Sequence, residues 1–577
     1  MSAARVFDWL AHHADFRGKE LAVVDLASDR RLDWINFNDR AARLAGFLRK
    51  SMGVQKGDRV GVLMPNTTDF LEVQFACMKL GAIFLPLNWR LTVPELTFIA
   101  GDAGPTVMIC GPEFRETAEA VAREIECLRH VVETDCNGGD SAYEQGIAEA
   151  EIATIDDTLT HDDVSTIMYT SGTTGLPKGA MITHGMTFWN VVNIGGPHRV
   201  TADTVHLSVL PLFHTGGLNC YTNPVIHNGG TVYIMRDFDP KVCLELMGDP
   251  DIGLTHFFGV PANYQFMAQQ PEFAETDLSR LQMAGVGGAP VPVPLLEIWD
   301  KRGLGVAQGF GMTETSPTVM TLDSKDAMLK PGSTGKPCMH NEVRIIDEDG
   351  NDVAVGEVGE LLVRGPNITP GYWNRPEATE AAFTDDWLHT GDASRMDEDG
   401  FYYIVDRTKD MYISGGENVY PAEVENVLYQ LEDIVEVAVV GLADDKWGEV
   451  GCAVTVLKSG SDLTAEAIIA HCRERLATFK VPKSVEFTTA LPRNATGKVL
   501  KRTIRDDLAA APAAWASGSS GWSATGTATR ASARTSIPAA ATTAARSDAA
   551  RGDRRSTTPS PVIQTAALWP TASAGGL

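Results

Sequence analysis

Residues 59–88 follow a pattern of strand, helix and strand. The apolar run RVGVLM fits a buried strand, and AIFLPLN fits a second one. Between them, TTDFLEVQFACMKLG has apolar residues at helical spacing, with Thr68 as the candidate N-cap and Gly81 as the stop signal. Two strands joined by one helix through short links predict a parallel sheet with a right-handed crossover.

Similar apolar runs recur through the first 400 residues. They are TVMIC (106–110), VHLSVLP (205–211), GTVYIM (230–235) and LGVAQGFG (304–311). The pattern predicts a large α/β domain over this part of the chain. Further along, VRIIDEDGN and MDEDGFYYIVDR each set an Asp-Gly turn beside β-rich residues, which predicts hairpins.

The pattern changes after Arg407, where a smaller α+β unit is predicted. YPAEVENVLYQL places Pro421 at the start of a helix, and TAEAIIAHCRERLATF predicts a second helix. Between these helices, VEVAVVGLAD and GEVGCAVTVLK predict strands.

Residues 509–577 have the composition of a low-complexity segment. They are dominated by Ala, Ser, Thr and Gly without periodicity, and they hold six Arg against two Asp in a chain of net charge −26. We expect this tail to be disordered, and we hypothesise that it is out-of-frame or otherwise spurious sequence. A natural disordered tail is the alternative.

Composition restricts the class of protein. A hydrophobic content of 44% and a charged content of 21% are typical of a soluble globular chain, and no apolar run reaches membrane-spanning length. The first 20 residues lack the apolar core of a signal peptide, and nine scattered cysteines without a CxxC pair favour a reduced cytoplasmic setting. The strongly negative charge argues against nucleic acid as a partner.

The stretch YTSGTTGLPKGAMITHG (169–185) surrounds Lys178 with glycines and hydroxyl side chains, and three interpretations are open from its residues. A Walker A loop is excluded, because Pro177 replaces the second glycine of that motif and Gly179 replaces its Ser or Thr. An exposed loop without function is the second interpretation. The third is a different phosphate-binding loop, in which hydroxyls and backbone N–H groups surround phosphate oxygens and Lys178 supplies charge.

This stretch resembles the phosphate-loop signature of the acyl-adenylate-forming superfamily, in its acyl-CoA synthetase branch. Further motifs follow in the order of that family: GFGMTET (309–315), GYWNRPEAT (371–379), WLHTGD (387–392), YYIVDRTKDMYISGGENVYPAEVE (402–425) and PRNATGKVLKR (492–502). The resemblance covers roughly residues 5–508. It implies a large N-terminal domain (1–406) of parallel-rich sheets with helices and a small β-barrel-like subdomain, followed by a small mobile α+β domain (407–508).

The resemblance also implies an ATP-dependent acid–CoA ligase, which makes an acyl-AMP and then transfers the acyl group to the CoA thiol. The co-substrates are ATP with Mg²⁺, and CoA. The residues implied to bind ATP or AMP are Thr170, Ser171, Gly172, Thr173, Thr174, Gly175, Lys178, Gly288, Ala289, Phe310, Gly311, Asp392 and Arg407. Glu314 resembles the Mg²⁺ ligand, and Thr313 is expected to bind the α-phosphate.

The small domain contributes further expected roles. Lys498 resembles the lysine that bridges the substrate carboxylate and the α-phosphate, and Lys409 matches the hinge position. The pantetheine tunnel is expected to include Ser414, Gly415, Gly416, Glu417 and Trp447. For Trp447, packing in the core is an equally good interpretation.

The acyl pocket is expected to contain His214, which would also shield the site between the two steps, with Phe258, Tyr264 and Gly287 around it. Tyr264 is the candidate for hydrogen bonding to the substrate. LPLFHTGGLN (210–219) lacks the Asp that captures an amino-acid ammonium, so amino-acid activation is not expected. The chain is most similar in texture to bacterial feruloyl-CoA synthetases and to medium- or long-chain fatty-acid–CoA ligases, and the sequence does not separate an aromatic from a fatty acid.

Two alternatives stay open at this point. One is an adenylating enzyme with an acceptor other than CoA, and the other is a non-catalytic nucleotide-binding relative. A homodimer is among the oligomeric states that the sequence leaves open.

Truncation after Leu508 is predicted to leave CoA ligation intact. The shortened chain keeps the Lys498 loop and loses only residues with too few apolar side chains to form a core. Thioester formation and solubility of the two chains would be compared, and loss of either on truncation would contradict the hypothesis of a spurious tail.

Overall fold

The computed structural model describes residues 4–170, 177–407 (without the side chain of Arg407), 410–415, 417–444, 446–494 and 497–510. The predicted tail lies outside these ranges from residue 511 onward, and so do the predicted site residues Ser171–Gly175, Lys409 and Gly416. The described residues all belong to one compact unit, Met1–Trp522.

The strands of the first sheet come from the first 183 residues. Their order is β6 (His130–Glu133), β5 (Pro105–Cys110), β3 (Arg59–Leu63), β4 (Ile83–Pro86), β7 (Val164–Thr170), β8 (Lys178–Thr183). All neighbours are parallel except β7 and β8. The predicted strand–helix–strand unit is therefore confirmed as β3, α3 (Thr68–Leu80) and β4. The N-cap is Thr67 rather than Thr68, because the Thr67 hydroxyl accepts from the Phe70 N–H, and Gly81 ends the helix at φ +67°.

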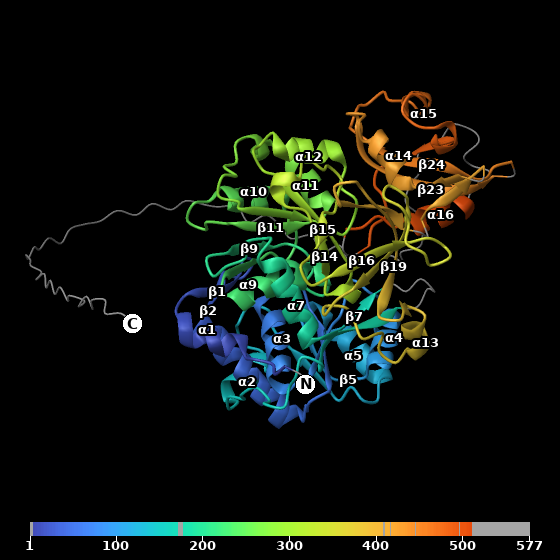
Figure 1. Cartoon of the computed structure of the whole chain (residues 1–577). Helices are drawn as coiled ribbons and strands as arrows, with labels where there is room; N and C mark the ends of the chain where they lie inside the picture. Colours follow the sequence, from blue (N-terminus) through green and yellow to red (C-terminus); the bar gives the residue numbers. More distant parts are fainter. Residues whose placement is uncertain are drawn as a thin grey trace, which may run out of the picture. The chain divides into compact units, whose positions relative to one another are not determined.

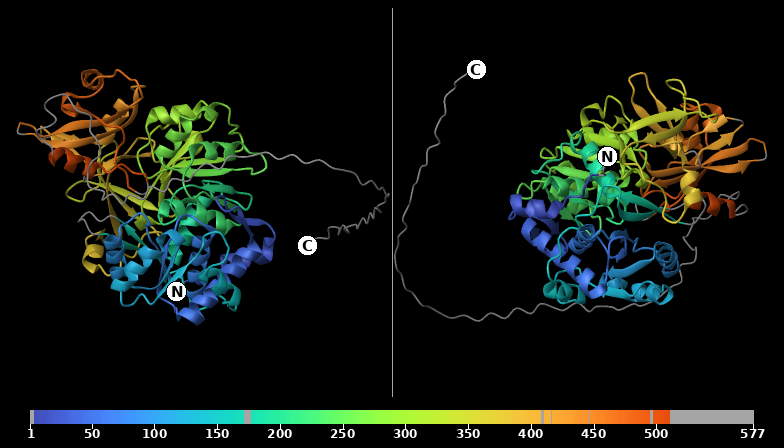
Figure 2. Two further views of the ribbon diagram at one scale, coloured as in Figure 1. Left: turned by 180° about the vertical axis from the view of Figure 1, so that it is seen from behind. Right: turned by 60° about the horizontal axis from the view of Figure 1, so that its bottom comes forward.

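The second sheet has the order β15 (Lys336–Pro337), β14 (Thr318–Thr321), β13 (Val306–Gly311), β12 (Met283–Val286), β11 (His256–Gly259), β9 (Val205–Ser208), β10 (Thr231–Ile234), β1 (Leu21–Asp25), β2 (Arg30–Asp33). From β13 to β1 the neighbours are parallel. Helices α10 (Pro240–Gly248), α11 (Pro261–Ala268) and α12 (Val293–Asp300) lie together against this sheet (Figure 1, Figure 2).

The third sheet joins β16 (Glu342–Ile346), β17 (Gly359–Arg364), β19 (Trp387–Met396) and β18 (Phe383–Thr384), with β20 (Tyr402–Arg407) paired to β19. It is antiparallel throughout, as expected for a subdomain built from hairpins. The hairpin predicted at MDEDGFYYIVDR is β19–β20. The turn at Asp349-Gly350 closes only a local Ile346–Asp352 bridge, because the partner strand of β16 begins later, at Gly359.

The last sheet contains β22 (Glu417–Val419), β21 (Tyr412–Ser414), β24 (Gly448–Leu457), β23 (Ile434–Asp444) and β25 (Ser484–Phe487). It packs with α14 (Pro421–Leu428), α15 (Ala465–Arg473) and α16 (Lys501–Ala510). Pro421 is the first residue of α14, as predicted. No helix in the described part of the chain is long and apolar enough to cross a lipid bilayer.

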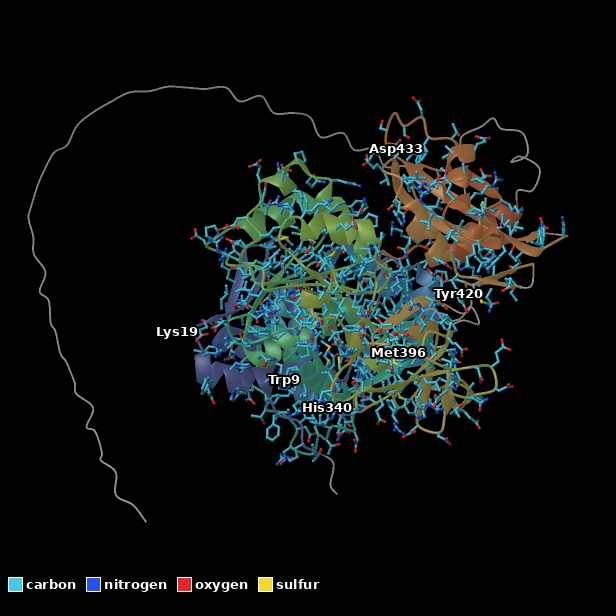
Figure 3. All side chains as sticks on the ribbon, turned by 45° about the horizontal axis from the view of Figure 1, so that its top comes forward. Trp9, Lys19, His340, Met396, Tyr420 and Asp433 are labelled. Carbon is cyan, nitrogen blue, oxygen red and sulfur yellow. The ribbon has the colours of Figure 1, made fainter. Side chains whose placement is uncertain are left out.

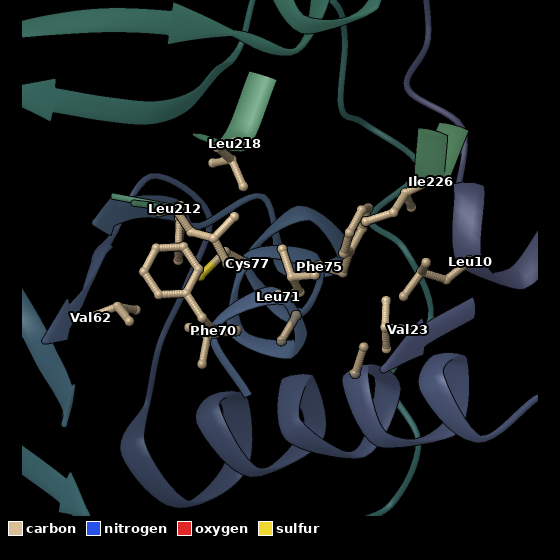
Figure 4. Close-up of a cluster of buried hydrophobic side chains, with 14 of the residues drawn as sticks. Leu10, Val23, Val62, Phe70, Leu71, Phe75, Cys77, Leu212, Leu218 and Ile226 are labelled. Carbon is tan, nitrogen blue, oxygen red and sulfur yellow. The ribbon is translucent and has the colours of Figure 1, made fainter. Parts of the chain in front are cut away.

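Helix α3 lies at the centre of the largest hydrophobic cluster. Its side chains pack against residues of β3 in the first sheet and of β1 in the second, and also against α1 (Trp9–Arg17) and α2 (Trp34–Met52) (Figure 4). Phe70, Leu71 and Phe75 are each at most 2% exposed. This one helix therefore joins the cores beneath both sheets.

Two carboxylates of α3, Asp69 and Glu72, are fully buried inside this apolar surrounding. Arg40 of α2 pairs with Glu72 at 2.7 Å and with Glu144 of α6 (Ala142–Glu149) at 2.6 Å, and Arg30 of β2 pairs with Asp69 at 2.5 Å. Burial alone would raise the pKa of Glu72, but the Arg40 and Arg30 guanidiniums hold it below its usual value. These buried charges are compensated only in the folded chain.

Replacing Arg40 with Met is predicted to destabilise the fold by about 3–5 kcal/mol, because Glu72 would lose its nearest cation while it stays buried. Arg31→Met is the matched control. Arg31 pairs with Asp29 in an exposed position, where such a bond contributes about 1 kcal/mol or less. Chemical denaturation of both variants measures the difference, and equal losses would contradict the importance of the buried network.

Candidate active site

The predicted phosphate loop lies between two paired strands. Strand β7 ends at Thr170 and β8 begins at Lys178, and these two residues are partners in the antiparallel register. This pairing fixes Lys178 at the start of β8, next to Thr170. The Nζ atom of Lys178 lies 5.1 Å from the ring centre of Tyr372, a cation–π contact.

Tyr372 connects Lys178 to the predicted metal ligand. Its hydroxyl donates to the Glu314 carboxylate at 3.0 Å, and the Thr369 N–H donates to the Glu314 carbonyl oxygen at 2.7 Å. Burial and the Glu314 charge raise the pKa of Tyr372, so the phenol stays a donor. Thr313 and Glu314 are 5% and 6% exposed, on the 3₁₀ turn η4 (Thr313–Thr315) that follows β13.

Glu314 suits a hard divalent cation whose remaining ligands are phosphate oxygens and water. Mg²⁺ is usually held by one or two carboxylates in nucleotide sites rather than by a full set of protein ligands. Within the described residues, no group of three or more His, Cys, Asp or Glu side chains could hold a metal. A single carboxylate fixed by Tyr372 fits this kind of binding.

Asp392 occupies a buried position on β19. It is 4% exposed, and the sheet register sets it opposite Arg407 of β20. Its N–H donates to the Thr390 hydroxyl, which itself donates to the Leu361 carbonyl at 2.7 Å. The backbone thus brings together the two residues that were expected to bind ribose.

The glycines after β12 leave room beside the predicted reaction centre. A Cβ atom on Gly288 would lie 3.3 Å from Lys498 Cε and 3.9 Å from its Nζ, and Gly288 has a φ of +81° that favours glycine. Lys498 is held by its loop, since its N–H donates to Asn494 Oδ1 at 2.9 Å. The structure therefore places Lys498 directly against Gly288.

His214 is an uncharged histidine in this arrangement. Burial, and then the positive charge of Lys498, lower its pKa to about 3. Its Nδ1 accepts from the Gly216 N–H at 3.1 Å, so the proton of the neutral ring is on Nε2. His214 therefore presents an N–H donor and no charge.

Phe310 and Gly311 end β13 beside this region. Phe310 is half-buried, and its ring packs on the cluster beneath β14 and β17. Gly311 cannot be replaced without moving the backbone, because a Cβ there would lie 1.8 Å from the Pro317 carbonyl oxygen. The chain approaches itself closely here and then enters the turn that carries Thr313.

The acyl side of the site was predicted to include a tyrosine that packs in the core. Phe258 on β11 is half-buried, and its Cζ would lie 3.3 Å from a Cβ on Gly287. Tyr264 is 1% exposed, packs in the core against Phe257 and Trp299, and donates to the Gly285 carbonyl at 2.9 Å. This hydroxyl already donates to the backbone and the ring packs in the core, so the arrangement offers no support for a hydrogen bond from Tyr264 to substrate, which stays a prediction.

Another tyrosine, Tyr221, has its hydroxyl beside β12. A Cβ on Gly285 would lie 2.7 Å from this oxygen and 2.9 Å from a ring carbon of Phe258. The Tyr221 hydroxyl is 2.6 Å from His198 Nδ1, and His198 Nε2 is bonded to the Thr321 hydroxyl. Sequence analysis missed Tyr221, although it lies only seven residues after His214.

The expected pantetheine residues lie around the β21–β22 turn. Ser414 is 5% exposed, Glu417 is exposed, and a Cβ on Gly415 would lie 3.0 Å from the Trp447 ring. Trp447 is 41% exposed, and Lys446 approaches its ring centre at 4.7 Å. Packing of Trp447 in the core is therefore excluded, and the ring lies against the glycine turn near the surface.

Comparison with known proteins assigns this arrangement to a family. The AMP-binding enzyme family matches residues 10–373, and the AMP-binding enzyme C-terminal domain matches residues 423–498. The chain belongs to the AMP-binding enzymes. This membership agrees with the resemblance of the motifs.

Named relatives narrow the activity within the AMP-binding enzymes. The chain is 44% identical to a feruloyl-CoA synthase of an Amycolatopsis species over 82% of this chain and 93% of that one. It is 38% identical to a long-chain-fatty-acid–CoA ligase of Mycobacterium tuberculosis, over 85% and 95% of the two chains. The ATP-bound crystal structure of MatB from Rhodopseudomonas palustris superposes with a TM-score of 0.80 at 32% identity, over 87% and 98%. The chain is thus an acid–CoA ligase that forms AMP and uses ATP and CoA, acting through an acyl-adenylate.

Proposed function

We propose that this acid–CoA ligase activates an aromatic acid of the hydroxycinnamate type, such as ferulate. The observation that supports this is the spacing between Gly285 on β12, beside the Tyr221 hydroxyl, and Gly288 just after the strand, beside Lys498. Three residues of chain span at most roughly 10 Å. A 4-hydroxycinnamate is roughly 8 Å long from its carboxyl carbon to its ring oxygen, by standard bond lengths.

The proposed substrate would lie beside Gly285 of β12 and Gly287, which follows the strand. Its carboxylate would meet Lys498, its ring would pack on Phe258 beside Gly287, and its ring oxygen would reach Tyr221. Phe258 packs closely on both glycines, since a Cβ on Gly285 would lie 2.9 Å from its ring and a Cβ on Gly287 3.3 Å from it, and this narrow side of the site favours a flat ring over a bulkier group. A fatty acid of long chain would have to pass Tyr221, which is 1% exposed and packed by the rings of His206 and His256.

Tyr221 is suited to bind a phenol because its hydrogen-bond partner, His198, can act either as a donor or as an acceptor. Burial, and then the nearby His256, lower the pKa of His198 to about 3, so the ring is neutral. If His198 Nδ1 carries the proton, it donates to Tyr221, and the Tyr221 hydroxyl is free to donate to substrate. If Nε2 carries the proton, it donates to the Thr321 hydroxyl, and Nδ1 accepts from the Tyr221 hydroxyl. The Tyr221 oxygen can then accept a hydrogen bond from the substrate phenol.

The adenylation step brings a carboxylate to the α-phosphorus of ATP, and the two anions repel each other. In the proposed mechanism, Lys498 neutralises the charge that develops between them, and Thr313 donates to the α-phosphate. The phosphate loop with Lys178 holds the leaving pyrophosphate, while Asp392 and Arg407 hold the ribose. Glu314 would hold Mg²⁺, which supplies further positive charge to the phosphates when bound.

The neutral state of His214 supports an acid without an ammonium group. An α-ammonium is normally recognised by a carboxylate, and the described residues of LPLFHTGGLN contain none. For the second step we infer a rearrangement about Lys409, after which Lys498 leaves and the β21–β22 turn with Trp447 approaches the thioester site.

Tyr221→Phe is predicted to reduce kcat/KM for 4-coumarate and ferulate about tenfold, because one hydrogen bond to the ring oxygen is lost. Cinnamate, which lacks that oxygen, should change less than twofold. Tyr264→Phe is the matched control, since its hydroxyl bonds Gly285 and its loss should affect both acids equally. The measurement is pyrophosphate release with each acid. A wild-type preference for palmitate over all aromatic acids, or an equal effect of Tyr221→Phe on both acids, would contradict the proposal.

Lys498→Ala is predicted to slow adenylation by roughly a hundredfold to a thousandfold, on the order of 3–4 kcal/mol, as for other single electrostatic stabilisers. With pre-made acyl-AMP and CoA, the same variant should form thioester at nearly the wild-type rate, because Lys498 acts only while the carboxylate attacks phosphorus. Stopped assays of the two half-reactions measure this. Equal damage to both would rule out the role given to Lys498.

A further inference from the structure

Asn190 lies inside the protein, where three segments of the candidate active site meet. It belongs to α7 (His184–Gly195), the helix that directly follows β8 with Lys178, and it is fully buried. Its side chain bonds to the backbone of two other segments. The Nδ2 atom donates to the Asn219 carbonyl at 2.8 Å, and the Oδ1 atom accepts from the Thr318 N–H at 3.1 Å.

These two segments serve different reactants under the proposed function. Asn219 belongs to the π-helical turn Leu218–Thr222, which also carries Tyr221 on the acid side of the site. Thr318 begins β14, directly after the segment with η4, the turn that carries the predicted α-phosphate and Mg²⁺ ligands. One side chain therefore connects the segment that would bind the acid with the segment that would bind the phosphate.

An amide side chain is well suited to join two backbone groups of opposite kind. The Asn219 carbonyl needs a donor and the Thr318 N–H needs an acceptor, and an amide carries these functions on two separate atoms. Leucine, which has nearly the same size as asparagine, has neither. Buried backbone groups are almost always hydrogen-bonded, so losing both bonds would let the two segments move apart to find other partners.

Other buried amides hold each of the two segments locally. Asn219 Oδ1 accepts from Asn223 Nδ2 at 2.7 Å on the acid side. On the phosphate side, Asn367 Nδ2 donates to the Thr315 carbonyl at 2.6 Å and to the Thr318 carbonyl at 3.0 Å. Each segment is thus stiff in itself, and the two bonds of Asn190 set the position of one relative to the other.

We propose that Asn190 is a positioning residue for adenylation, which holds the acid in line with the α-phosphate. The proposal rests on the proposed placement of these two reactants. In this step a carboxylate oxygen forms a bond to the α-phosphorus, the bond from that phosphorus to the bridging oxygen breaks, and pyrophosphate leaves with the electron pair. A misplacement of about 1 Å between reacting groups can slow such a step by on the order of a hundredfold.

The second half-reaction does not need this alignment. Once the acyl-AMP has formed, the acid and the phosphate are joined by a covalent bond, and their relative position no longer depends on the protein. Asn190 is therefore important for adenylation and unimportant for the transfer of the acyl group to the CoA thiol. A residue with a merely structural role would affect both half-reactions.

Asn193 provides a matched control in the same helix. It lies three residues after Asn190 and is 1% exposed. Its Nδ2 donates to Asn341 Oδ1 at 2.6 Å, and its Oδ1 accepts from Nδ1 of His340, labelled in Figure 3, at 2.8 Å. These partners lie between β15 and β16, in a stretch without any of the site residues named above. Asn193→Leu therefore removes an equally buried amide and leaves the connection through Asn190 intact.

The test measures both half-reactions of Asn190→Leu and of Asn193→Leu. Adenylation is followed as pyrophosphate release in a single turnover without CoA, and acyl transfer as thioester formation from pre-made acyl-AMP and CoA. The acid is the one that the wild-type enzyme activates fastest, so the outcome does not depend on the hydroxycinnamate assignment. Asn190→Leu is expected to slow adenylation roughly ten- to a hundredfold, with KM for ATP and acid within about threefold and thioester formation within about twofold of wild type.

Asn193→Leu is expected to change both half-reactions by the same factor. Melting temperatures check the folding of both variants, and Asn190→Ala is assayed by the same criterion if Asn190→Leu does not fold. Equal loss of both half-reactions in the Asn190 variant, or an equally selective loss of adenylation in Asn193→Leu, would overturn the proposal. Lys498→Ala is assayed alongside. If it loses adenylation selectively while the Asn190 variant does not, the positioning role alone is refuted and the proposed mechanism stands.

Discussion

The buried carboxylates of α3 constrain the fold more than any other interaction in the described chain. Asp69 and Glu72 lie on a helix whose remaining surface packs into apolar cores beneath two different sheets. A carboxylate in such a position costs several kcal/mol unless cations reach it. The cations come from β2 and α2, so the helix, the edge of the second sheet and the N-terminal helices can assemble only in one register. Apolar packing alone would tolerate a rotation or shift of α3, whereas the charge pairs do not.

With α3 fixed, the orientation of the strands determines where the site forms. Strands β13, β12, β11 and β9 are parallel neighbours, so their carboxyl ends lie along the same edge of the sheet. The residues that follow them are the Thr313 turn, the glycines at 287–288, the start of α11 and the segment with His214. Residues separated by about 100 positions in the chain are brought together because each follows its strand at this edge. Lys178 of the first sheet is linked to the same region, because it contacts the ring of Tyr372, whose hydroxyl donates to Glu314.

Much of this could be predicted from the sequence, and the exceptions have physical reasons. Short apolar runs identify β3, β4, β5, β9, β10 and β13. A strand that is buried on both faces is almost continuously apolar, so its composition alone is enough to find it. The motifs predict which residues form the site, and the structure sets Asp392 opposite Arg407 and places Lys498 next to Gly288, a contact that the sequence did not predict. The sequence alone could not decide which of the two neighbouring threonines, Thr67 or Thr68, caps the helix. The exposure of Trp447 could not be predicted either, because a tryptophan in a turn has no periodicity that assigns it to a face.

The two tyrosines show the same limit more sharply. Tyr264 follows a strand and a Pro at a helix start, and its position along the chain is compatible with a pocket. Its ring instead packs against Trp299 in the core, and its hydroxyl donates a hydrogen bond to the Gly285 carbonyl. Tyr221 lies in a mixed stretch without periodicity (LNCYTN, 218–223), yet the π-helical turn Leu218–Thr222 places its hydroxyl beside the same glycine. Each residue of an α-helix is rotated by about 100° from the one before it, so one extra residue in a turn points a side chain in a different direction. No local feature of the sequence predicts the π-helical turn.

Charged and neutral side chains are separated within the site. This separation suits two unlike ligands, a charged nucleotide and a largely apolar acid. Lys178 begins β8, Asp392 lies within β19 and Lys498 lies in a loop of the C-terminal part, and these are the positions where phosphates and ribose are expected. Beyond Gly287 the polar groups are neutral: His214 and His198 are held uncharged by burial, and Tyr221 keeps its proton because burial raises its pKa. A carboxylate entering this pocket finds a cation at only one end. Under the proposed function, it would be oriented with its anionic group toward the phosphates before any bond forms, and its apolar remainder would lie along Gly285 and Gly287. This orientation requires only that the far end of the acyl pocket carries no charge. The buried His198–Tyr221 pair meets this requirement, because both side chains are neutral.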